Sequence, residues 1–286
     1  MLSFVRSLVR HLPVSWQGHS RLLYWRFRNV LRTSSGEHAL KLGPARDGRW
    51  LLTDGRRTLS IAAPSRVGIY RRGIEARLAE IQRAFHTDVV ELRSGDVVID
   101  IGANIGEFSL PLLERDVTVH AFEMDPNVIP ALRANLGAHP QAFVHHIGLW
   151  NENTSGTMHL NTATADTSLI ANGSRDQAAV RCQRLDDVEL AGCPESIKLL
   201  KCDAEGAEPE VLAGALRTLA RTDFVAVDCG PERGEQSMRT NRAVARLLGE
   251  LGFAIILEPS GAREVLVARN TRTATPTVIS PQQRVR

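Results

Sequence analysis

The amino-acid sequence predicts an α/β protein with a mostly parallel sheet covered by helices on both faces. From residue 96 onward, short apolar runs of strand length alternate with segments of helical period, the pattern of strands joined by crossover helices. The β-branched run at 97–101 is typical of a buried parallel strand. Only residues 259–263 separate the last two apolar runs. This is too short for a parallel crossover, so the final strand is expected to run antiparallel.

The first 69 residues are expected to form a basic cap made of a helix and a β-hairpin. An apolar stripe of helical period covers residues 2–12, and residues 21–31 add aromatic and arginine side chains. Residues 49–62 predict a hairpin whose turn is Asp54-Gly55. The helical stripe favours packing on the protein's own core or on a second subunit, as in a homo-oligomer. Peripheral contact with a membrane surface is the alternative.

The elements after the cap follow in order. Residues 74–85 predict a helix that leads into the first strand of the sheet. Strands are then expected at 97–101, 117–122, 142–147, 196–202, 223–228, 253–258 and 264–269. Helices are expected at 107–115, 126–137, 207–220 and 238–251. Asp125 and Pro126 suit the N-cap and first position of the second of these helices.

The polar stretch at 151–177 interrupts the alternation of strands and helices. It predicts a short strand at 156–160, a loop rich in Thr, Asp and Ser, and then a strand at 178–184. A polar loop beside the carboxyl ends of parallel strands is a common substrate lid, and a disordered insertion is the alternative. Residues 271–286 are expected to be a flexible tail. The predicted domains are therefore 1–69, 70–270 and 271–286.

The net charge of +3 is unevenly distributed along the chain. Residues 1–94 hold 17 Lys and Arg against 7 Asp and Glu, whereas the remainder holds 18 against 25. This asymmetry suits an anionic partner for the basic part, with a solvated basic face as the alternative.

The location of the protein is expected to be cytoplasmic. The apolar runs are short for a membrane span, and Arg6 and Arg10 interrupt what would be the apolar part of a signal peptide. The four cysteines show neither C-x-x-C pairing nor zinc-site spacing, as expected in a reducing compartment.

A glycine turn after the first sheet strand indicates a nucleotide-type ligand. The segment reads Asp100-x-Gly102-x-x-x-Gly106, which lacks the G-x-G-x-x-G spacing of dinucleotide-binding proteins. An acid at this position would repel a pyrophosphate and suits a ligand that carries positive charge. Glu123 ends the next strand about 20 residues later, where a carboxylate binds ribose hydroxyls in nucleotide-binding α/β folds.

Three blocks of the sequence resemble the FkbM family of S-adenosylmethionine-dependent methyltransferases. They are DIGANIG from residue 100, AFEMDP from residue 121 and IKLLKCDAEGAEPEVLAGA from residue 197. The resemblance implies a Rossmann-like class I methyltransferase fold with a seven-stranded sheet and a reversed last strand. It also implies O-methylation of a hydroxyl on a sugar, nucleotide sugar, glycolipid or secondary metabolite. The chain departs from the family pattern at Glu123-Met124-Asp125-Pro126, where Glu-Pro is usual, and at Asp228, where Glu is more frequent.

The candidate site residues lie where the strands end, because ligands of open α/β sheets bind there. The expected cofactor-binding residues are Asp100, Gly102, Ala103, Asn104, Gly106, Glu123, Gly148 and Leu149. Gly148 and Leu149 would border the adenine.

The expected catalytic residues are Asp203, Glu205 and Asp228. An alcohol is a weak nucleophile until it loses its proton, so one of these acids could be the general base. Alternatively the three could hold Mg²⁺, which is not the favoured interpretation. Glu208 is expected in the first turn of a helix, where an acid interacts favourably with the helix dipole. His145 and His146 are left out of the site.

Three other functions are weighed against the methyltransferase. An NAD(P)-dependent sugar oxidoreductase is disfavoured by the glycine spacing and by the absence of Tyr-x-x-x-Lys, since the only tyrosines are Tyr24 and Tyr70. A nucleic-acid partner is disfavoured by the 5% aromatic content and the lack of an N/D-P-P-Y/F motif. A non-catalytic Rossmann-like subunit is disfavoured by the intact glycine turn. The expected partner is a small-molecule or glycan acceptor. A phosphorylated or lipid-linked acceptor would suit the basic N-terminal region.

Overall fold

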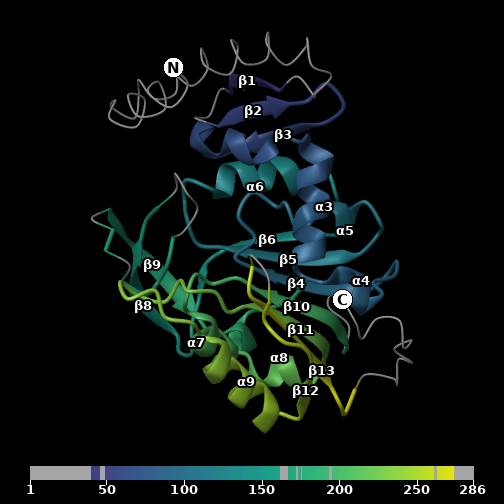
Figure 1. Cartoon of the computed structure of the whole chain (residues 1–286), viewed down its shortest axis with the longest axis vertical. Coiled ribbons are helices and arrows are strands. Elements are labelled where there is room, and N and C mark those ends of the chain that lie inside the picture. Colours follow the sequence, from purple (N-terminus) through teal and green to yellow (C-terminus); the bar gives the residue numbers. More distant parts are fainter. Residues whose placement is uncertain are drawn as a thin grey trace.

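A seven-stranded sheet forms the centre of the protein, with the strand order β12-β13-β11-β10-β4-β5-β6 (Figure 1). The computed structural model describes residues 40–45, 49–161, 167–171, 173–174, 176–192, 195–260 and 263–273. The strands of the central sheet are β4 (Val97–Ile101), β5 (Thr118–Glu123), β6 (Ala142–His146), β10 (Ile197–Cys202), β11 (Thr222–Asp228), β12 (Phe253–Leu257) and β13 (Val265–Asn270). The sequence predicted all of them to within one residue at each end.

The direction of the strands follows the prediction. β4, β5, β6, β10 and β11 pair in parallel. β13 lies between β12 and β11 and pairs antiparallel with both. The short connection before β13 therefore does reverse the last strand, and the sheet has the architecture of a Rossmann-like class I methyltransferase.

Helices cover the two faces of this sheet. They are α3 (Ile74–Ala84), α4 (Thr87–Val90), α5 (Leu110–Leu113), α6 (Ile129–Leu136), α7 (Glu208–Ala213), α8 (Leu216–Ala220) and α9 (Asn241–Glu250), with 3₁₀ turns η1 (Pro64–Tyr70) and η2 (Leu185–Asp187). Neighbouring residues of β4 pack in different cores: Val98 belongs to the core with α3, α5 and α6, whereas Val97 and Ile99 belong to the core with α7, α8 and α9. Burial on both faces explains why this strand is apolar throughout.

Several predicted helices are shorter than their sequence patterns. The helix expected at 207–220 is split into α7 and α8 at Gly214, where a Cβ would lie 2.0 Å from the carbonyl oxygen of Trp150. α5 is a single turn inside the expected 107–115.

The predicted start of the helix at 126–137 is wrong, because α6 begins at Ile129. Asp125 instead closes the preceding turn, where its carboxylate accepts a hydrogen bond from Asn127 N at 2.8 Å.

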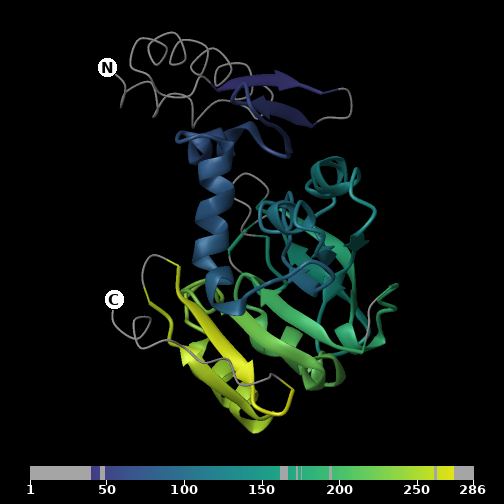
Figure 2. The ribbon, with the colours of Figure 1, turned by 90° about the vertical axis from the view of Figure 1, so that its right-hand side faces the viewer.

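The N-terminal cap contains a three-stranded antiparallel sheet of β1 (Lys41–Pro44), β2 (Trp50–Thr53) and β3 (Thr58–Ile61). The predicted hairpin is confirmed as β2 and β3, while β1 was not anticipated. Figure 2 shows α3 running from this small sheet down to the central one. The cap and the central sheet share one continuous apolar core. The expected helix at 2–12 and the aromatic and arginine-rich stretch at 21–31 lie outside the described residues, as does most of the expected tail. The domain boundaries stay predictions.

A second small sheet follows β6 and has the order β7-β9-β8. Its strands are β7 (Gly148–Leu149), β8 (Thr154–His159) and β9 (Gln177–Gln183), close to the two short strands expected here. Among the helices of the described residues, none has both the length and the apolar character that crossing a bilayer requires.

Candidate active site

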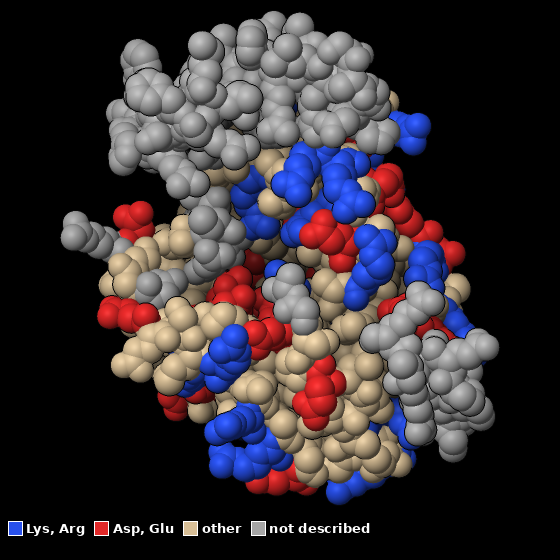
Figure 3. All heavy atoms as spheres, viewed as in Figure 1, with Lys and Arg blue, Asp and Glu red and all other residues tan. Residues whose placement is uncertain are grey.

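The carboxyl ends of β4, β5 and β10 open into one cavity. It encloses about 1060 Å³ of empty space, its open mouth included. Residues 102–104, Glu123, Asp203 and Glu205, which follow or end these strands, all line it. Figure 3 shows acidic side chains gathered around a hollow near the middle of the face seen in Figure 1. The structure thus brings the cofactor and catalytic candidates to one place.

The glycine turn owes its shape to neighbouring protein as well as to any ligand. Gly102 has φ +70°, and a Cβ there would lie 1.9 Å from the carbonyl oxygen of Asp203. Gly106 has φ +92° and packs against Leu132 and Leu136 without lining the cavity. The two glycines therefore let Asp203, which follows β10, and helix α6 approach the turn closely. The cavity wall itself is formed by the backbone of residues 102–104.

Asp100 lies beneath this turn rather than in the cavity. Its side chain is fully buried and forms an ion pair with Lys201, with Nζ 3.0 Å from Oδ1. Ser109 Oγ donates to the other oxygen at 2.6 Å. The Lys201 ammonium also donates to the carbonyl oxygens of Ile101 at 2.9 Å and Gly102 at 2.8 Å. Asp100 therefore fixes the lysine that holds the turn, and we expect it to support cofactor binding indirectly.

Glu123 faces the cavity at the end of β5. Its two carboxylate oxygens accept hydrogen bonds from Asn104 N at 2.9 Å and Asp125 N at 2.8 Å. Burial raises the pKa of Glu123 to about 7, even though these backbone N–H groups favour the ionised form. A carboxylate keeps further lone pairs for two ribose hydroxyls, so the position fits the predicted role.

The expected adenine edge is also part of the cavity. Gly148 and Leu149 form β7, are buried and line the cavity beside Ile147. His145 instead stacks on Phe122, with ring centroids 4.4 Å apart. His145 and His146 are not among the lining residues, in agreement with their omission from the site.

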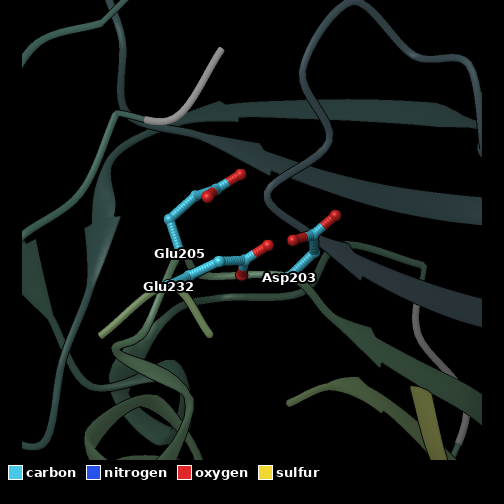
Figure 4. A group of neighbouring side chains, drawn as sticks. All are labelled: Asp203, Glu205 and Glu232. Carbon is cyan, nitrogen blue, oxygen red and sulfur yellow. The ribbon is translucent and has the colours of Figure 1, made fainter. Parts of the chain in front are cut away.

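Three carboxylates meet at the other side of the cavity. Asp203, Glu205 and Glu232 each present an oxygen such that all three oxygens lie within 4.8 Å of one another (Figure 4). Asp203 and Glu205 follow β10, whereas Glu232 comes from the loop after β11. We call these three residues the acidic cluster. Sequence analysis named Asp228 as its third member, but the structure places Glu232 there.

Asp228 and Asp203 are held by a shared arginine. Arg263 Nη1 lies 2.6 Å from Asp203 Oδ2 and 3.1 Å from Asp228 Oδ2. Asp228 is buried and does not line the cavity. Burial opposes ionisation of Asp203, but the charges of Arg263 and Lys201 outweigh it and lower the pKa of Asp203. Asp228 is thus engaged by Arg263 and, like Glu232, is not among the residues that line the cavity, whereas Asp203 lines it but is a poor proton acceptor.

Glu232 has the opposite electrostatic environment. Burial raises the pKa of Glu232 to about 8, and the nearby carboxylates of Asp203 and Asp228 add to this rise. Its Oε2 is buried without a hydrogen-bond partner. With this pKa the group is largely protonated at neutral pH, and once ionised at higher pH it is a stronger base than an ordinary carboxylate.

The loop after β10 is built to carry Glu205. Glu205 has φ +50°, and the next residue, Gly206, has φ +93°. A Cβ on Gly206 would lie 2.5 Å from the Cα of Arg233, so glycine lets the Glu232 loop approach. Arg233 Nη1 donates to Gly206 O at 2.7 Å, and its guanidinium pairs with Glu210. These contacts bring Glu232 beside Glu205.

Glu208 has a structural role that helix-dipole reasoning alone did not reveal. Its carboxylate is buried and accepts hydrogen bonds from the backbone N–H groups of Ala204 at 3.0 Å and Gly206 at 2.9 Å. Burial raises the pKa of Glu208 to about 7. The residue therefore closes the loop that presents Glu205.

The predicted lid segment also reaches the site. Thr167 and Leu169 line the cavity. Thr167 Oγ1 donates to Asp125 Oδ2 at 3.0 Å, and Ser168 Oγ donates to Glu205 O at 2.7 Å. This segment connects the cofactor side to the acidic cluster; whether it opens stays a prediction.

Sequence reasoning missed several charged residues of the site, among them Glu232, Arg263, Arg66 and Arg77. Arg263 lies in the short turn before β13, and Glu232 lies four residues after a strand end. Both therefore follow the rule that led to the other candidates. Arg66 and Arg77 belong to the cap and to α3, from which no contribution to the cavity was expected.

The acidic cluster has the hard oxygen ligands that Mg²⁺ prefers. One member, Asp203, already lies 2.6 Å from the guanidinium of Arg263 and 3.9 Å from Lys201 Nζ. These cations supply to Asp203 part of the positive charge that a metal would otherwise bring; that the cluster acts without a metal stays a prediction.

The chain matches known methyltransferases over most of its length. The family model of the methyltransferase FkbM domain matches residues 100–255. The 2-O-methyltransferase NoeI of Sinorhizobium fredii is 25% identical over 247 residues, which cover 79% of this chain and 98% of NoeI. The 31-O-demethyl-FK506 methyltransferase FkbM of Streptomyces tacrolimicus is 36% identical over 159 residues, which cover 44% of this chain and 61% of that protein.

Solved structures show only a distant likeness. Magnesium protoporphyrin IX methyltransferase ChlM from Synechocystis PCC 6803, with bound S-adenosylmethionine, is 12% identical and covers 69% of this chain and 79% of its own. The TM-score is 0.42. The family match spans the glycine turn, Glu123 and the acidic cluster, and leaves no support for an oxidoreductase. The chain belongs to the FkbM family and is an S-adenosylmethionine-dependent methyltransferase.

Proposed function

We propose that this enzyme methylates a hydroxyl oxygen of a sugar or a related small metabolite, with Glu232 as the general base. The acidic cluster beside the cofactor cavity is the observation that carries the proposal. The names of two relatives support the oxygen acceptor, since NoeI is a 2-O-methyltransferase and FkbM methylates a 31-O-demethyl compound.

The chemistry explains why a carboxylate is needed here. S-adenosylmethionine supplies a methyl group that its positive sulfur has already activated. The residues of the chain must hold the acceptor oxygen in line with that methyl group and accept the hydroxyl proton.

Glu232 is the best proton acceptor of the four acids near this end of the cavity. Arg263 keeps Asp203 ionised, so Asp203 is a weaker base. The buried Asp228 is also held by Arg263 and is not part of the acidic cluster. Glu205 lines the cavity directly, and we assign it to binding the acceptor hydroxyls. Glu232 lies next to Glu205 and combines an unpartnered Oε2 with a raised pKa. Of the three catalytic candidates predicted from the sequence, Asp203 thus becomes a support, Glu205 a group that binds the acceptor and Asp228 a buried partner of Arg263.

The basic surface near the cavity favours an acceptor with an anionic group. Exposed Arg71 and Arg72 follow η1, whose Arg66 lines the cavity. Figure 3 shows basic side chains gathered on the face above the hollow. A phosphorylated or lipid-linked sugar would satisfy this charge.

The buried free cysteines Cys182 and Cys202 support a reducing, cytoplasmic location.

The experiment compares Glu232→Gln with Glu235→Gln, an exposed glutamate on the same loop. Turnover should fall about 100-fold or more in Glu232→Gln, while the affinity for S-adenosylhomocysteine stays within about twofold. Because the base acts in its ionised form, kcat/KM for the wild type should rise with pH and level off above about pH 8. This rise should be absent in Glu232→Gln. Turnover in Glu232→Gln close to that of the control would refute the assignment.

A further inference from the structure

Residues 167–171, which we call the bridge segment, contact both halves of the site. The backbone of Ser168 pairs with that of His159 at the end of β8, with N–O distances of 2.8 and 3.1 Å. Thr167 and Ser168 are buried, and Thr167 and Leu169 line the cavity. The surrounding protein therefore fixes this segment, and the hydroxyl groups of its first two residues have defined partners.

Thr167 bonds to the cofactor side. Its Oγ1 donates to Asp125 Oδ2 at 3.0 Å and accepts a hydrogen bond from Asn161 N at 3.0 Å. Asp125 is 1% exposed and borders the cavity. The Asp125 N–H donates to Glu123 Oε1 at 2.8 Å, and Glu123 is the expected ribose ligand. One residue thus separates Thr167 from the carboxylate that is expected to meet the cofactor.

Ser168 bonds to the acceptor side. Its Oγ donates to Glu205 O at 2.7 Å. Glu205 has φ +50°, a backbone conformation that is uncommon for residues other than glycine, so this hydrogen bond helps to hold it. A Cβ on Gly234 would lie 3.8 Å from Ala171 O, so the bridge segment also borders the loop of Glu232. The segment therefore connects the ribose-binding side to the backbone that presents Glu205.

A bound cofactor should favour the docked position of the bridge segment, in which both hydroxyl groups make these hydrogen bonds. A ligand that fills the cavity touches Thr167 and Leu169 only when the segment lies against the cavity, as it does in this structure. A ligand shifts an equilibrium toward the state that it binds more tightly. Because the docked segment also holds Glu205, cofactor binding would fix the Glu205 loop as well.

We propose that Thr167 and Ser168 are positioning residues that couple cofactor binding to the placement of Glu205. Thr167 responds to the cofactor through Asp125, and Ser168 holds the Glu205 loop. The consequence for catalysis rests on the proposed function, in which Glu205 binds acceptor hydroxyls. The acceptor site is then complete only after S-adenosylmethionine has bound, so that the acceptor oxygen is aligned with a methyl group already in place.

The test follows hydrogen–deuterium exchange of backbone amides with and without saturating S-adenosylhomocysteine. Two amides of the Glu205 loop, those of Ala204 and Gly206, donate to the carboxylate of Glu208. These amides exchange with solvent only when the loop opens, so their exchange rates report how firmly the loop is held.

The proteins are the wild type and four variants. Thr167→Val and Ser168→Ala each remove one hydroxyl of the bridge segment, and Thr167→Ser keeps the hydroxyl of Thr167. The control is Ser174→Ala, since the hydroxyl of Ser174 donates to Leu160 O at 2.7 Å rather than to the Glu205 loop. Thermal melting reports whether each variant folds, and calorimetry gives the saturating ligand concentration for each protein.

In the wild type, the ligand should slow exchange of the two loop amides about fivefold or more, the lower end of the usual coupling between sites. It should also slow exchange in the bridge segment. Thr167→Val and Ser168→Ala should lose this protection of the loop, whereas Thr167→Ser and Ser174→Ala should keep it. Because the Thr167 hydroxyl donates to Asp125 and not to the loop, its removal tests the connection rather than the loop itself.

Protection of the loop that persists in Thr167→Val would overturn the inference, because the ligand would then act on the loop directly. An unchanged ratio of the exchange rates with and without ligand in Ser168→Ala would also overturn it, leaving the serine a purely structural role. In the wild type, an unprotected loop, or a protected loop beside an unprotected bridge segment, would refute the coupling even if every variant misfolds.

No acceptor takes part in these measurements. Full turnover of Glu232→Gln would therefore refute the general base and leave the coupling intact. A wild type that does not bind S-adenosylhomocysteine would instead refute the cofactor assignment, and the inference with it.

Discussion

Replacing Lys201 by methionine would remove the cation that lies beneath both halves of the site. The ammonium is 3% exposed and is surrounded by the carboxylate of Asp100 and the carbonyl oxygens of Ile101 and Gly102. Burial alone would lower the pKa of Lys201, but Asp100 and Asp203 outweigh it and raise the pKa. The lysine is therefore charged in the folded protein, and its loss leaves a fully buried carboxylate without a cation.

The magnitude follows from that geometry. Removing one partner of a buried ion pair typically destabilises a protein by about 3–5 kcal/mol. The hydrogen bond from Ser109 to Asp100 remains and moderates the loss. For a chain of this size we expect the melting temperature to fall by roughly 10 °C. Because Lys201 also holds the carbonyl oxygens of the glycine turn, the affinity for S-adenosylhomocysteine should fall as well.

The assay is denaturant and thermal unfolding of Lys201→Met beside Lys198→Met. Lys198 lies on the same strand and pairs with Asp223 at 3.3 Å, but it is 26% exposed. The control should therefore lose less than about 1 kcal/mol. Adding Asp100→Asn to Lys201→Met should restore part of the stability, because the stranded charge is then gone. Stability of Lys201→Met within about 1 kcal/mol of the wild type would refute this reasoning.

Three further predictions follow from the site. Gly206→Ala places a Cβ 2.5 Å from the Cα of Arg233, so turnover should fall about 100-fold as the Glu232 loop is displaced. The control is Gly55→Ala, which also has a positive φ of +87° but adds its Cβ in open space and should leave turnover unchanged. Affinity for S-adenosylhomocysteine should rise between pH 6 and pH 8 as Glu123 ionises around its pKa of about 7. A flat profile in the wild type, or an equal rise in Glu123→Gln, would contradict this. EDTA should leave turnover unchanged because Arg263 and Lys201 already neutralise Asp203, and loss of activity restored by Mg²⁺ would show that a metal is needed.

Strand positions and the cofactor side could be predicted because their signals are local. Each central strand is a short apolar run next to a turn, and the carboxyl ends of parallel strands necessarily meet. Glu123 could be placed in the site from its position alone. The turn at Gly102 was also predicted, on the argument that a ligand approaches its backbone. The structure adds a second reason for glycine, because the carbonyl oxygen of Asp203 occupies the space of a side chain.

The remaining features depend on contacts between distant segments. An acid at the end of β4 looks the same in sequence whether it faces a ligand or a buried lysine. The parallel register that pairs Asp100 with Lys201 appears only in the fold. Glu232 reaches the acidic cluster because Gly206 lets Arg233 approach. Arg66 lines the cavity although it belongs to the cap, and α3 runs from the cap to the central sheet (Figure 2).

The most direct test of the central claim is transfer of an isotopically labelled methyl group from S-adenosylmethionine to a pool of candidate sugars, with the product located by NMR. We expect the wild type to place the label on a hydroxyl oxygen as a methyl ether. Glu232→Gln should form the same product about 100-fold more slowly. A label on nitrogen or carbon, or an undiminished rate in Glu232→Gln, would contradict the account.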